Sequence, residues 1–344
     1  DENGIAKVSI LGRGKFKGLK VIEATKTSAE VIKLEAPKYG ITAVEYINEL
    51  YEYDGEGLKI DNTPDQNIRY YGSDPNNYVS FNNELWRIIG VFGNNVKLVR
   101  SESLGNLSWD SSESSINSGW GVNEYAGADL QVYLNKMYYE GNTTVTCYSS
   151  YDNQTTTCPT NRLDETAKSL IDNHTWKTGA IEWSKRTNTL AFYKDERGNE
   201  TGKICNGGDY CNDTVERTTE WTGYVALSYA TDWAYASSES DCETNMNAVD
   251  IDFDNQIFNM TCKKNNWMHH GTTRDIEDAT WFMSLYALPG LADAVWCVNG
   301  VGTTDFGNAA LPLFAFPTIY LKSNILIESG KGTSSNPYIL KAGS

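Results

Sequence analysis

Residues 78–101, YVSFNNELWRIIGVFGNNVKLVRS, predict three consecutive strands joined by two tight turns. The dipeptides Asn82-Asn83 and Gly93-Asn94 are favoured in two-residue hairpin turns, because Asn and Gly tolerate positive φ. Trp86 and the pair Ile88-Ile89 are typical of a strand that is buried in a core. The expected strands are Tyr78–Phe81, Leu85–Phe92 and Asn95–Ser101. The sequence therefore predicts an antiparallel meander at this point of the chain.

Apolar side chains recur at helical spacing in three other segments. The expected helices are Thr42–Tyr53, Asp129–Tyr139 and Leu163–Asn173. Thr42 can cap the first helix, and Glu45 follows at the position that completes a capping box. Further strands are expected at Phe316–Lys322, Ile325–Glu328 and Tyr338–Leu340. Short strands with a few helices and long polar loops predict an α+β fold.

An N-terminal segment, residues 1–40, has a different pattern. Apolar and polar side chains alternate between Ile5 and Leu11, which predicts a strand, and a second extended segment is expected at Leu19–Ala24. Lysines gather here although the chain is acidic, so a basic strand arm would be attracted to a neighbouring copy. The alternative is an ordinary hairpin with lysines on its edge. The candidate assembly strand comprises Ile5, Ala6, Val8, Ile10 and Leu11.

The composition excludes some partners. The 344 residues include 29 basic and 45 acidic side chains, which give a formal net charge of −16. Binding to a phosphate backbone requires the opposite charge, so we expect no nucleic-acid partner. We also expect no transmembrane segment, because no apolar run is long enough to span a bilayer. The chain opens without a signal peptide, and for a secreted protein this places the numbering after processing.

Seven cysteines indicate an extracellular, oxidising location. Six of them form local pairs within polar loop insertions at about residues 141–162, 194–217 and 240–265. The expected disulfides join Cys147 to Cys158, Cys205 to Cys211, and Cys242 to Cys262. Zinc is the rival interpretation, but zinc sites usually need a Cys-x-x-Cys pair or suitably spaced histidines. Cys297 lies in an apolar run and is expected to be a buried free thiol, with an intermolecular bridge as the alternative.

Seven Asn-x-Ser/Thr sequons agree with an exterior location. They begin at Asn106, Asn142, Asn153, Asn173, Asn199, Asn212 and Asn259. Several fall in or beside the cysteine loops, where an acceptor for glycosylation would be exposed. The alternative is that a chain rich in Asn, Ser and Thr contains sequons by chance.

The search for chemistry yields little, and we expect no enzyme. No Gly-x-Ser-x-Gly elbow is present, and the histidines are limited to His174, His269 and His270. Asp250, Asp252 and Asp254 would share one face of an extended segment and could hold calcium, although the EF-hand pattern is not met. A solvated acidic strand is the alternative, and no other cofactor is indicated.

Several segments together resemble a family of large, uncharacterised exported proteins of gut bacteria. They are LWRIIGV (85–91), GWGVNEY (119–125), RTTEWTGYVAL (217–227), PTIYLKSN (317–324) and GKGTSSNPY (330–338). The resemblance covers roughly residues 42–340. It implies a core similar to that of C-type lectins and formylglycine-generating enzymes, in which a rigid scaffold carries a variable loop surface. The family's usual Gly-Val-Arg-Pro is replaced here by Ala315-Phe316-Pro317, so this chain lacks the family's arginine at that position.

Together these observations predict two parts, a strand arm at 1–40 and a C-type-lectin-like surface domain at 41–344. The function expected first is that of an extracellular structural protein, a pilus-like filament subunit that forms a homopolymer through its N-terminal strand. The alternative is a monomeric lectin-like adhesin that binds glycans through exposed aromatic and amide side chains.

Overall fold

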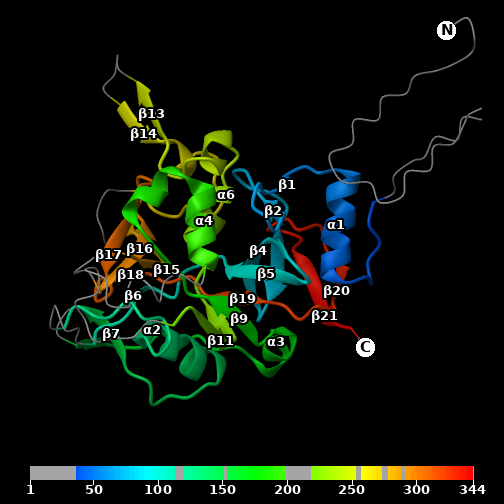
Figure 1. Ribbon diagram of the computed structural model, residues 1–344. Helices are drawn as coiled ribbons and strands as arrows, with labels where there is room; N and C mark the ends of the chain where they lie inside the picture. The colour runs from blue at the N-terminus through cyan, green and yellow to red at the C-terminus, as the bar shows by residue number, and fades with distance from the viewer. Residues whose placement is uncertain are drawn as a thin grey trace, which may run out of the picture.

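The computed structural model describes residues 36–343 except 113–118, 151–152, 199–217, 253–256, 273–277 and 288–291. The described chain is mixed α+β, with more strand than helix (Figure 1). The α+β prediction is therefore confirmed. The predicted strands Ile5–Leu11 and Leu19–Ala24 lie outside the described residues.

The larger sheet has nine strands. Seven follow the order β12–β19–β5–β4–β3–β21–β20, while β2 pairs with β4 and β1 pairs with β2. Their bounds are β1 (Leu58–Ile60), β2 (Ile68–Tyr70), β3 (Tyr78–Phe81), β4 (Glu84–Phe92), β5 (Asn95–Arg100), β12 (Val225–Ala226), β19 (Thr318–Tyr320), β20 (Ile325–Ser329) and β21 (Tyr338–Ala342). Strand β21, the last strand described, joins β3 in parallel.

The predicted meander is present as β3, β4 and β5. Asn82 and Asn83 have φ values of 57° and 58°, as a two-residue turn with two left-handed residues requires. Gly93 opens the second turn with φ 58°. The antiparallel pairs of this meander place Tyr78 opposite Arg87, and Trp86 opposite Arg100.

The second sheet has six strands in the order β17–β16–β15–β18–β6, with β10 beside β15. Their bounds are β6 (Asn106–Ser108), β10 (Ala180–Ile181), β15 (Thr280–Tyr286), β16 (Ala294–Val298), β17 (Thr304–Asn308) and β18 (Pro312–Phe314). Three two-stranded ribbons complete the strands: β7 (Cys147–Ser150) with β8 (Gln154–Thr156), β9 (His174–Lys177) with β11 (Glu220–Gly223), and β13 (Val249–Asp252) with β14 (Ile257–Met260).

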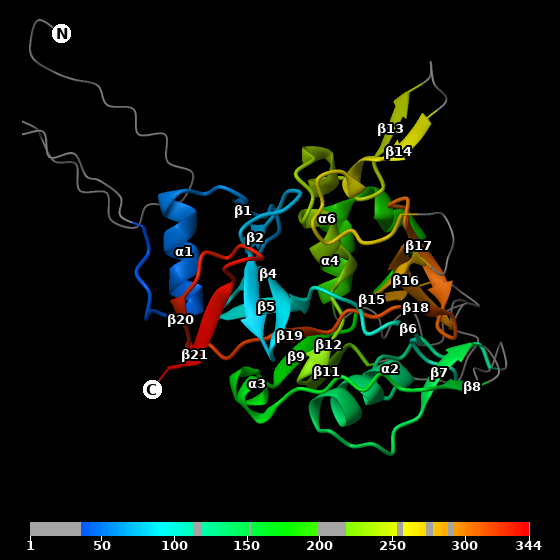
Figure 2. The same ribbon diagram turned by 180° about the vertical axis from the view of Figure 1, so that it is seen from behind.

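Five α-helices are described: α1 (Ala43–Tyr53), α2 (Asp129–Val132), α3 (Glu165–Leu170), α4 (Thr189–Arg197) and α6 (Ala230–Tyr235). Helix α2 continues as a wider π-helix, η1 (Tyr133–Tyr139), and three short 3₁₀ turns are η2 (Trp183–Thr187), η3 (Ser240–Glu243) and η4 (Thr261–Lys263). Viewed from the front and from behind, α4 and α6 lie between the strands of the two sheets (Figures 1 and 2). Helix α6 contacts both β15 and β16.

The first two predicted helices are confirmed. Glu45 N–H donates to the Thr42 hydroxyl, and the Glu45 carboxylate accepts from Thr42 N–H, so the capping box at α1 is complete. The third helix is shorter than predicted. It ends at Leu170 because Ile171 is extended and pairs with Leu321.

The strand predicted at Phe316–Lys322 is also shorter, because β19 covers only Thr318–Tyr320. Pro317 has no N–H for a sheet ladder, so pairing begins after it. The strands predicted at Ile325–Glu328 and Tyr338–Leu340 are confirmed as β20 and β21.

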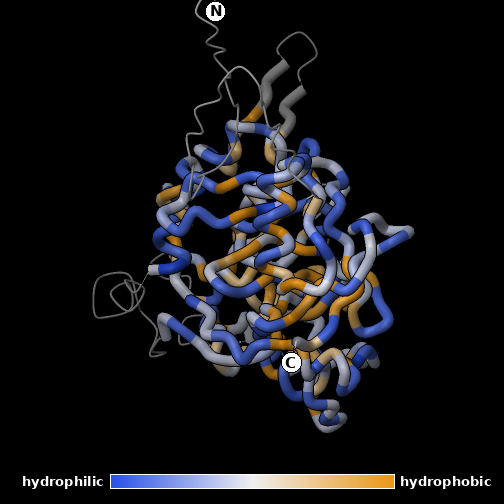
Figure 3. The backbone as a smooth tube through the Cα atoms, turned by 90° about the vertical axis from the view of Figure 1, so that its right-hand side faces the viewer, coloured by the Kyte–Doolittle hydropathy of each residue, from blue (hydrophilic) through white to orange (hydrophobic). Residues whose placement is uncertain are grey.

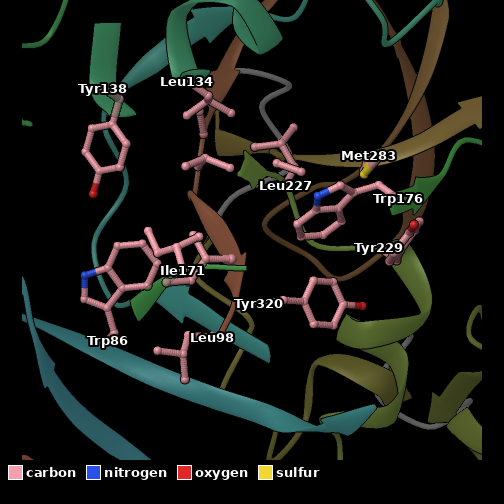
Figure 4. Close-up of a cluster of buried hydrophobic side chains, with 14 of the residues drawn as sticks. Trp86, Leu98, Leu134, Tyr138, Ile171, Trp176, Leu227, Tyr229, Met283 and Tyr320 are labelled. Atoms are coloured by element: carbon pink, nitrogen blue, oxygen red, sulfur yellow. The ribbon is translucent and has the colours of Figure 1, made fainter. Parts of the chain in front are cut away.

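The buried apolar side chains of the described residues form two clusters, and the larger cluster includes residues of both sheets. Apolar residues are concentrated towards the middle of the molecule, and polar residues lie mostly towards its outside (Figure 3). Trp86 and Leu98 from the larger sheet, Leu134 from η1 and Met283 from the second sheet belong to one cluster of buried side chains (Figure 4). Burial on this scale is the main favourable term in folding.

A close approach of two strands explains a glycine inside β4. A Cβ atom on Gly90 would lie 2.2 Å from the carbonyl oxygen of Ile68 on β2 and 3.1 Å from the Cα of Arg69. The register of β4 against β5 also shifts between Ile88 and Gly90. Only glycine fits where two backbones come this close.

We expect Gly90→Ala to lower the free energy of unfolding by about 1–3 kcal/mol, the usual cost of forcing extra volume into a packed interior. Urea unfolding of the full chain measures this. Ser80→Ala on the neighbouring β3 is the matched control, because Ser80 is exposed and should change stability little. Equal stability of the two variants would contradict the close approach.

Candidate functional site

Two of the three predicted disulfides are present. Cys147–Cys158 closes the β7–β8 ribbon, with Cα atoms 5.2 Å apart, and Cys242–Cys262 joins η3 to η4 with Cα atoms 5.5 Å apart. The second bridge lies at the base of the β13–β14 ribbon, which projects from the body in Figure 1. Cys205 and Cys211 lie outside the described residues.

Cys297 is a buried free thiol, as predicted. It lies on β16, and burial raises the pKa of its thiol well above the ordinary value. A thiol held in its protonated form is a poor nucleophile.

The four sequon asparagines that the structure describes with side chains are exposed: Asn106, Asn142, Asn153 and Asn173. Asn199 and Asn212 lie outside the described residues, and Asn259 lies on β14, where only the backbone is described. Glycosylation stays a prediction for all seven.

The structure describes the predicted calcium ligands only in part. Asp250 and Asp252 lie on β13, where only the backbone is described, and Asp254 lies outside the described residues. Among the side chains that the structure describes, no group of three or more His, Cys, Asp or Glu residues could hold a metal ion. The calcium site therefore stays a prediction.

The three histidines contact different groups. His174 Nδ1 is 3.2 Å from the Asp172 carboxylate, and its ring stacks on Tyr320. His269 Nε2 lies 3.0 Å from a backbone carbonyl oxygen, and His270 stacks on Phe316. The candidate assembly strand, Ile5, Ala6, Val8, Ile10 and Leu11, lies outside the described residues.

The main concentration of ionisable side chains in the described interior lies between the two sheets. We call it the buried charge network. It comprises Asp61, Arg69 on β2, Lys97 on β5, Glu196 and Arg197 on α4, and Asp232 on α6. Three carboxylates thus face three cations, so the formal charges balance. Burying charges is costly unless each has a partner, and this network supplies one for each.

Asp232 is the centre of the network. Its Oδ1 lies 2.8 Å from Arg69 Nη1, and its Oδ2 lies 2.5 Å from Lys97 Nζ. Oδ2 also accepts the backbone N–H of Tyr229 at 3.0 Å, which caps the start of α6. Arg197 Nη2 is 4.0 Å from Oδ1. The short helix α6 is therefore tied to two strands of the larger sheet.

Arg69 extends the network to a tight turn. Its Nε lies 2.5 Å from Asp61 Oδ2, and Asp61 in turn accepts from the hydroxyl and N–H of Thr63 and from Asn67. This turn connects β1 to β2. The carboxylate of Asp61 therefore has its oxygens satisfied although the side chain is buried.

Glu196 extends the network to the second sheet. Ser284 of β15 donates to it at 2.6 Å, Arg197 lies 2.7 Å from it, and the Thr231 hydroxyl also donates to it. Glu196 is fully buried. Through it, the network reaches from β2 and β5 across two helices to β15.

Lys97 lies in an aromatic cage. Its Nζ is 4.4 Å from the ring centroid of Tyr229 and between 5.3 and 5.4 Å from those of Phe92, Trp176 and Tyr320. The side chain has no exposed surface. Trp176, Tyr229 and Tyr320 are visible as neighbours in Figure 4. Ring faces attract an ammonium group, which offsets part of its lost hydration.

Burial and neighbouring charges shift the pKa values of Lys97 and Asp232. Burial lowers the pKa of Lys97 to about 8, although Asp232 opposes the shift. Burial alone would raise the pKa of Asp232, but Lys97, Arg69 and Arg197 outweigh it and hold that pKa well below the usual range. Asp232 faces three cations whereas Lys97 contacts one carboxylate, which is why the carboxylate keeps its charge more firmly.

Comparison with known proteins identifies no relative: no family model, no curated protein and no solved structure matches the chain. None of the described helices combines the length and apolar character needed to cross a bilayer.

Removing Asp232 should destabilise the fold more than removing Lys97. In Asp232→Asn, Lys97 loses its carboxylate and Arg69 keeps only Asp61, whereas in Lys97→Met the Asp232 carboxylate keeps Arg69. We expect Asp232→Asn to cost about 3–5 kcal/mol of unfolding free energy, and Lys97→Met to cost less. Urea unfolding near neutral pH measures both. The reverse order would contradict the central position of Asp232.

Acid should weaken the contribution of Asp232 to the free energy of unfolding. The folded-state pKa of Asp232 lies below its unfolded value of about 3.9, so its stabilising contribution is complete above that value and is lost as the pH falls towards the folded-state pKa. The stability difference between the wild-type chain and Asp232→Asn should therefore stay constant from about pH 6 to about pH 5 and shrink from there to about pH 3. A difference that stays constant in urea unfolding over this range would contradict the assignment.

Proposed function

We propose that the chain is an extracellular structural protein, a subunit of a cell-surface filament that assembles through its N-terminal strand. The observation that carries the proposal is the place where the N-terminal segment joins the fold. Residues 40–42 lie along the outer edge of β20, on the side away from β21.

This junction has defined contacts. Gly40 N–H donates to the Ile327 carbonyl at 2.8 Å, and Ile327 N–H donates to the Ile41 carbonyl at 3.2 Å. Thr42 pairs with Leu326 in antiparallel orientation. Ala36 and Lys38, just ahead, are exposed. The alternating segment Ile5–Leu11 therefore precedes a stretch that already adds to a sheet edge, and strand addition to a neighbouring copy uses the same main-chain bonding.

Charge and cross-linking support the same proposal. The candidate strand and the residues after it carry Lys7, Arg13, Lys15, Lys17 and Lys20 on a chain with net charge −16. Opposite charges on an arm and a body favour contact between copies. The two described disulfides agree with an oxidising, extracellular location.

An adhesin that binds glycans as a monomer is the second candidate. Tyr39, Tyr53 and Trp120 expose between 42% and 50% of their surface. Trp120 stands between Gly119 and Gly121, both with positive φ, on a turn at the surface. Aromatic faces of this kind stack on sugar rings. Binding of the monomeric chain on a glycan array would support this candidate, and the absence of binding would count against it.

Negative-stain electron microscopy of the intact chain beside a chain lacking residues 1–18 tests the filament proposal. We expect fibres from the intact chain and single particles from the shortened one, because the second lacks the candidate strand. Single particles from both would contradict the proposal and favour the adhesin.

A face-specific pair of variants sharpens this test. Val8→Ser combined with Ile10→Ser removes the apolar face of the strand and should abolish fibres. Ser9→Ala, on the opposite face, should leave them intact. Fibres from both variants would exclude pairing through that apolar face.

A further inference from the structure

The contact between Lys97 and Asp232 joins parts of the chain that are far apart in sequence. The amine nitrogen lies 2.5 Å from the carboxylate oxygen Oδ2, across a separation of 135 residues. Both side chains are fully buried. An amine and a carboxylate in contact, fixed by the surrounding fold, are in effect at very high local concentration.

The environment shields this pair from water. Phe92, Trp176, Tyr229 and Tyr320 surround the amine with ring faces, and neither side chain reaches solvent. A low-dielectric, dry site lowers the cost of converting an ion pair into a neutral amine and a neutral acid. It also disfavours the reverse reaction of an amide with water.

The two arginines of the buried charge network each keep a carboxylate partner outside this pair. Arg69 keeps Asp61 at 2.5 Å, and Arg197 keeps Glu196 at 2.7 Å. Removing one positive and one negative charge together leaves two cations and two carboxylates. The interior would remain balanced after Lys97 and Asp232 had lost their charges.

We propose that Lys97 and Asp232 condense to form an intramolecular isopeptide bond between β5 and α6. The proposal is independent of whether the chain polymerises. It assigns to this interior a covalent cross-link in addition to the described disulfides. The ion pair is the state from which the bond forms, so the acid titration of Asp232 belongs to the chain in which the bond has not formed.

The step balances without a co-reactant. A proton passes from the Lys97 ammonium to Asp232 Oδ2 along their hydrogen bond. The neutral amine then attacks the carboxyl carbon, a second proton moves from nitrogen to the same oxygen, and Oδ2 departs as water. The product is a secondary amide with Oδ1 as its carbonyl oxygen. The lowered pKa of Lys97, about 8, makes the neutral amine accessible near neutral pH.

The two arginines fit roles in this step. Arg69 Nη1 lies 2.8 Å from Oδ1, and Arg197 Nη2 lies 4.0 Å from it. Negative charge would develop on Oδ1 in the tetrahedral intermediate, where fixed donors are most effective. Arg69 would donate a hydrogen bond to Oδ1 directly, and Arg197 would contribute its positive charge from 4.0 Å.

Mass spectrometry of the full-length protein, after reduction of its disulfides, tests the proposal. We expect the intact mass to be lower than the sequence mass by one water. A tryptic digest should contain a branched peptide that joins residues 88–100 to residues 218–263, because the linked Lys97 is no longer a cleavage site. An unmodified mass, with residues 88–97 and 218–263 recovered as separate linear peptides, would overturn the proposal.

Lys97→Met and Asp232→Ala provide matched controls, because each lacks one reacting group. Both should show the full sequence mass, whether or not they fold stably. Loss of water that persists in either variant would place the dehydration elsewhere and overturn the assignment.

Discussion

A carboxylate placed deep in an apolar interior requires positive partners, and the fold is arranged to supply them to Asp232. One partner comes from β2, one from β5 and one from α4. Removing such a charge from water costs several kcal/mol in the absence of compensation. The strands and helices that carry these partners must therefore keep fixed positions relative to one another. The position of the carboxylate thus constrains both sheets.

The two sheets contribute different groups to the buried charge network. The larger sheet provides basic residues that point towards α6, while the second sheet provides the hydroxyl of Ser284 through Glu196. Helices α4 and α6 lie between them and are short. Their placement relies on the polar contacts as well as on packing, since a helix of six residues has little stability of its own.

Local patterns could be predicted from the sequence, and long-range ones could not. Asn82-Asn83 specifies its turn through local conformational preference, Thr42 and Glu45 specify a helix start, and closely spaced cysteines pair within their loops. Lys97 gives no comparable signal. A lysine within a strand normally indicates a solvated face, and only the arrival of α6, 135 residues later, buries it. The short third helix has the same origin, because Ile171 leaves the helix to pair with the distant Leu321.

The disulfide between Cys242 and Cys262 fixes two points of the chain 5.5 Å apart, at the base of the β13–β14 ribbon. The body of the protein meets this excursion through those two anchored points, through η3 and η4, and through the buried side chain of Met246. The ribbon beyond Met246 projects from the body in Figure 1, away from the packing of the core. The ribbon is a natural position for sequence divergence, and for grafting a foreign peptide of chosen length onto an otherwise unchanged scaffold.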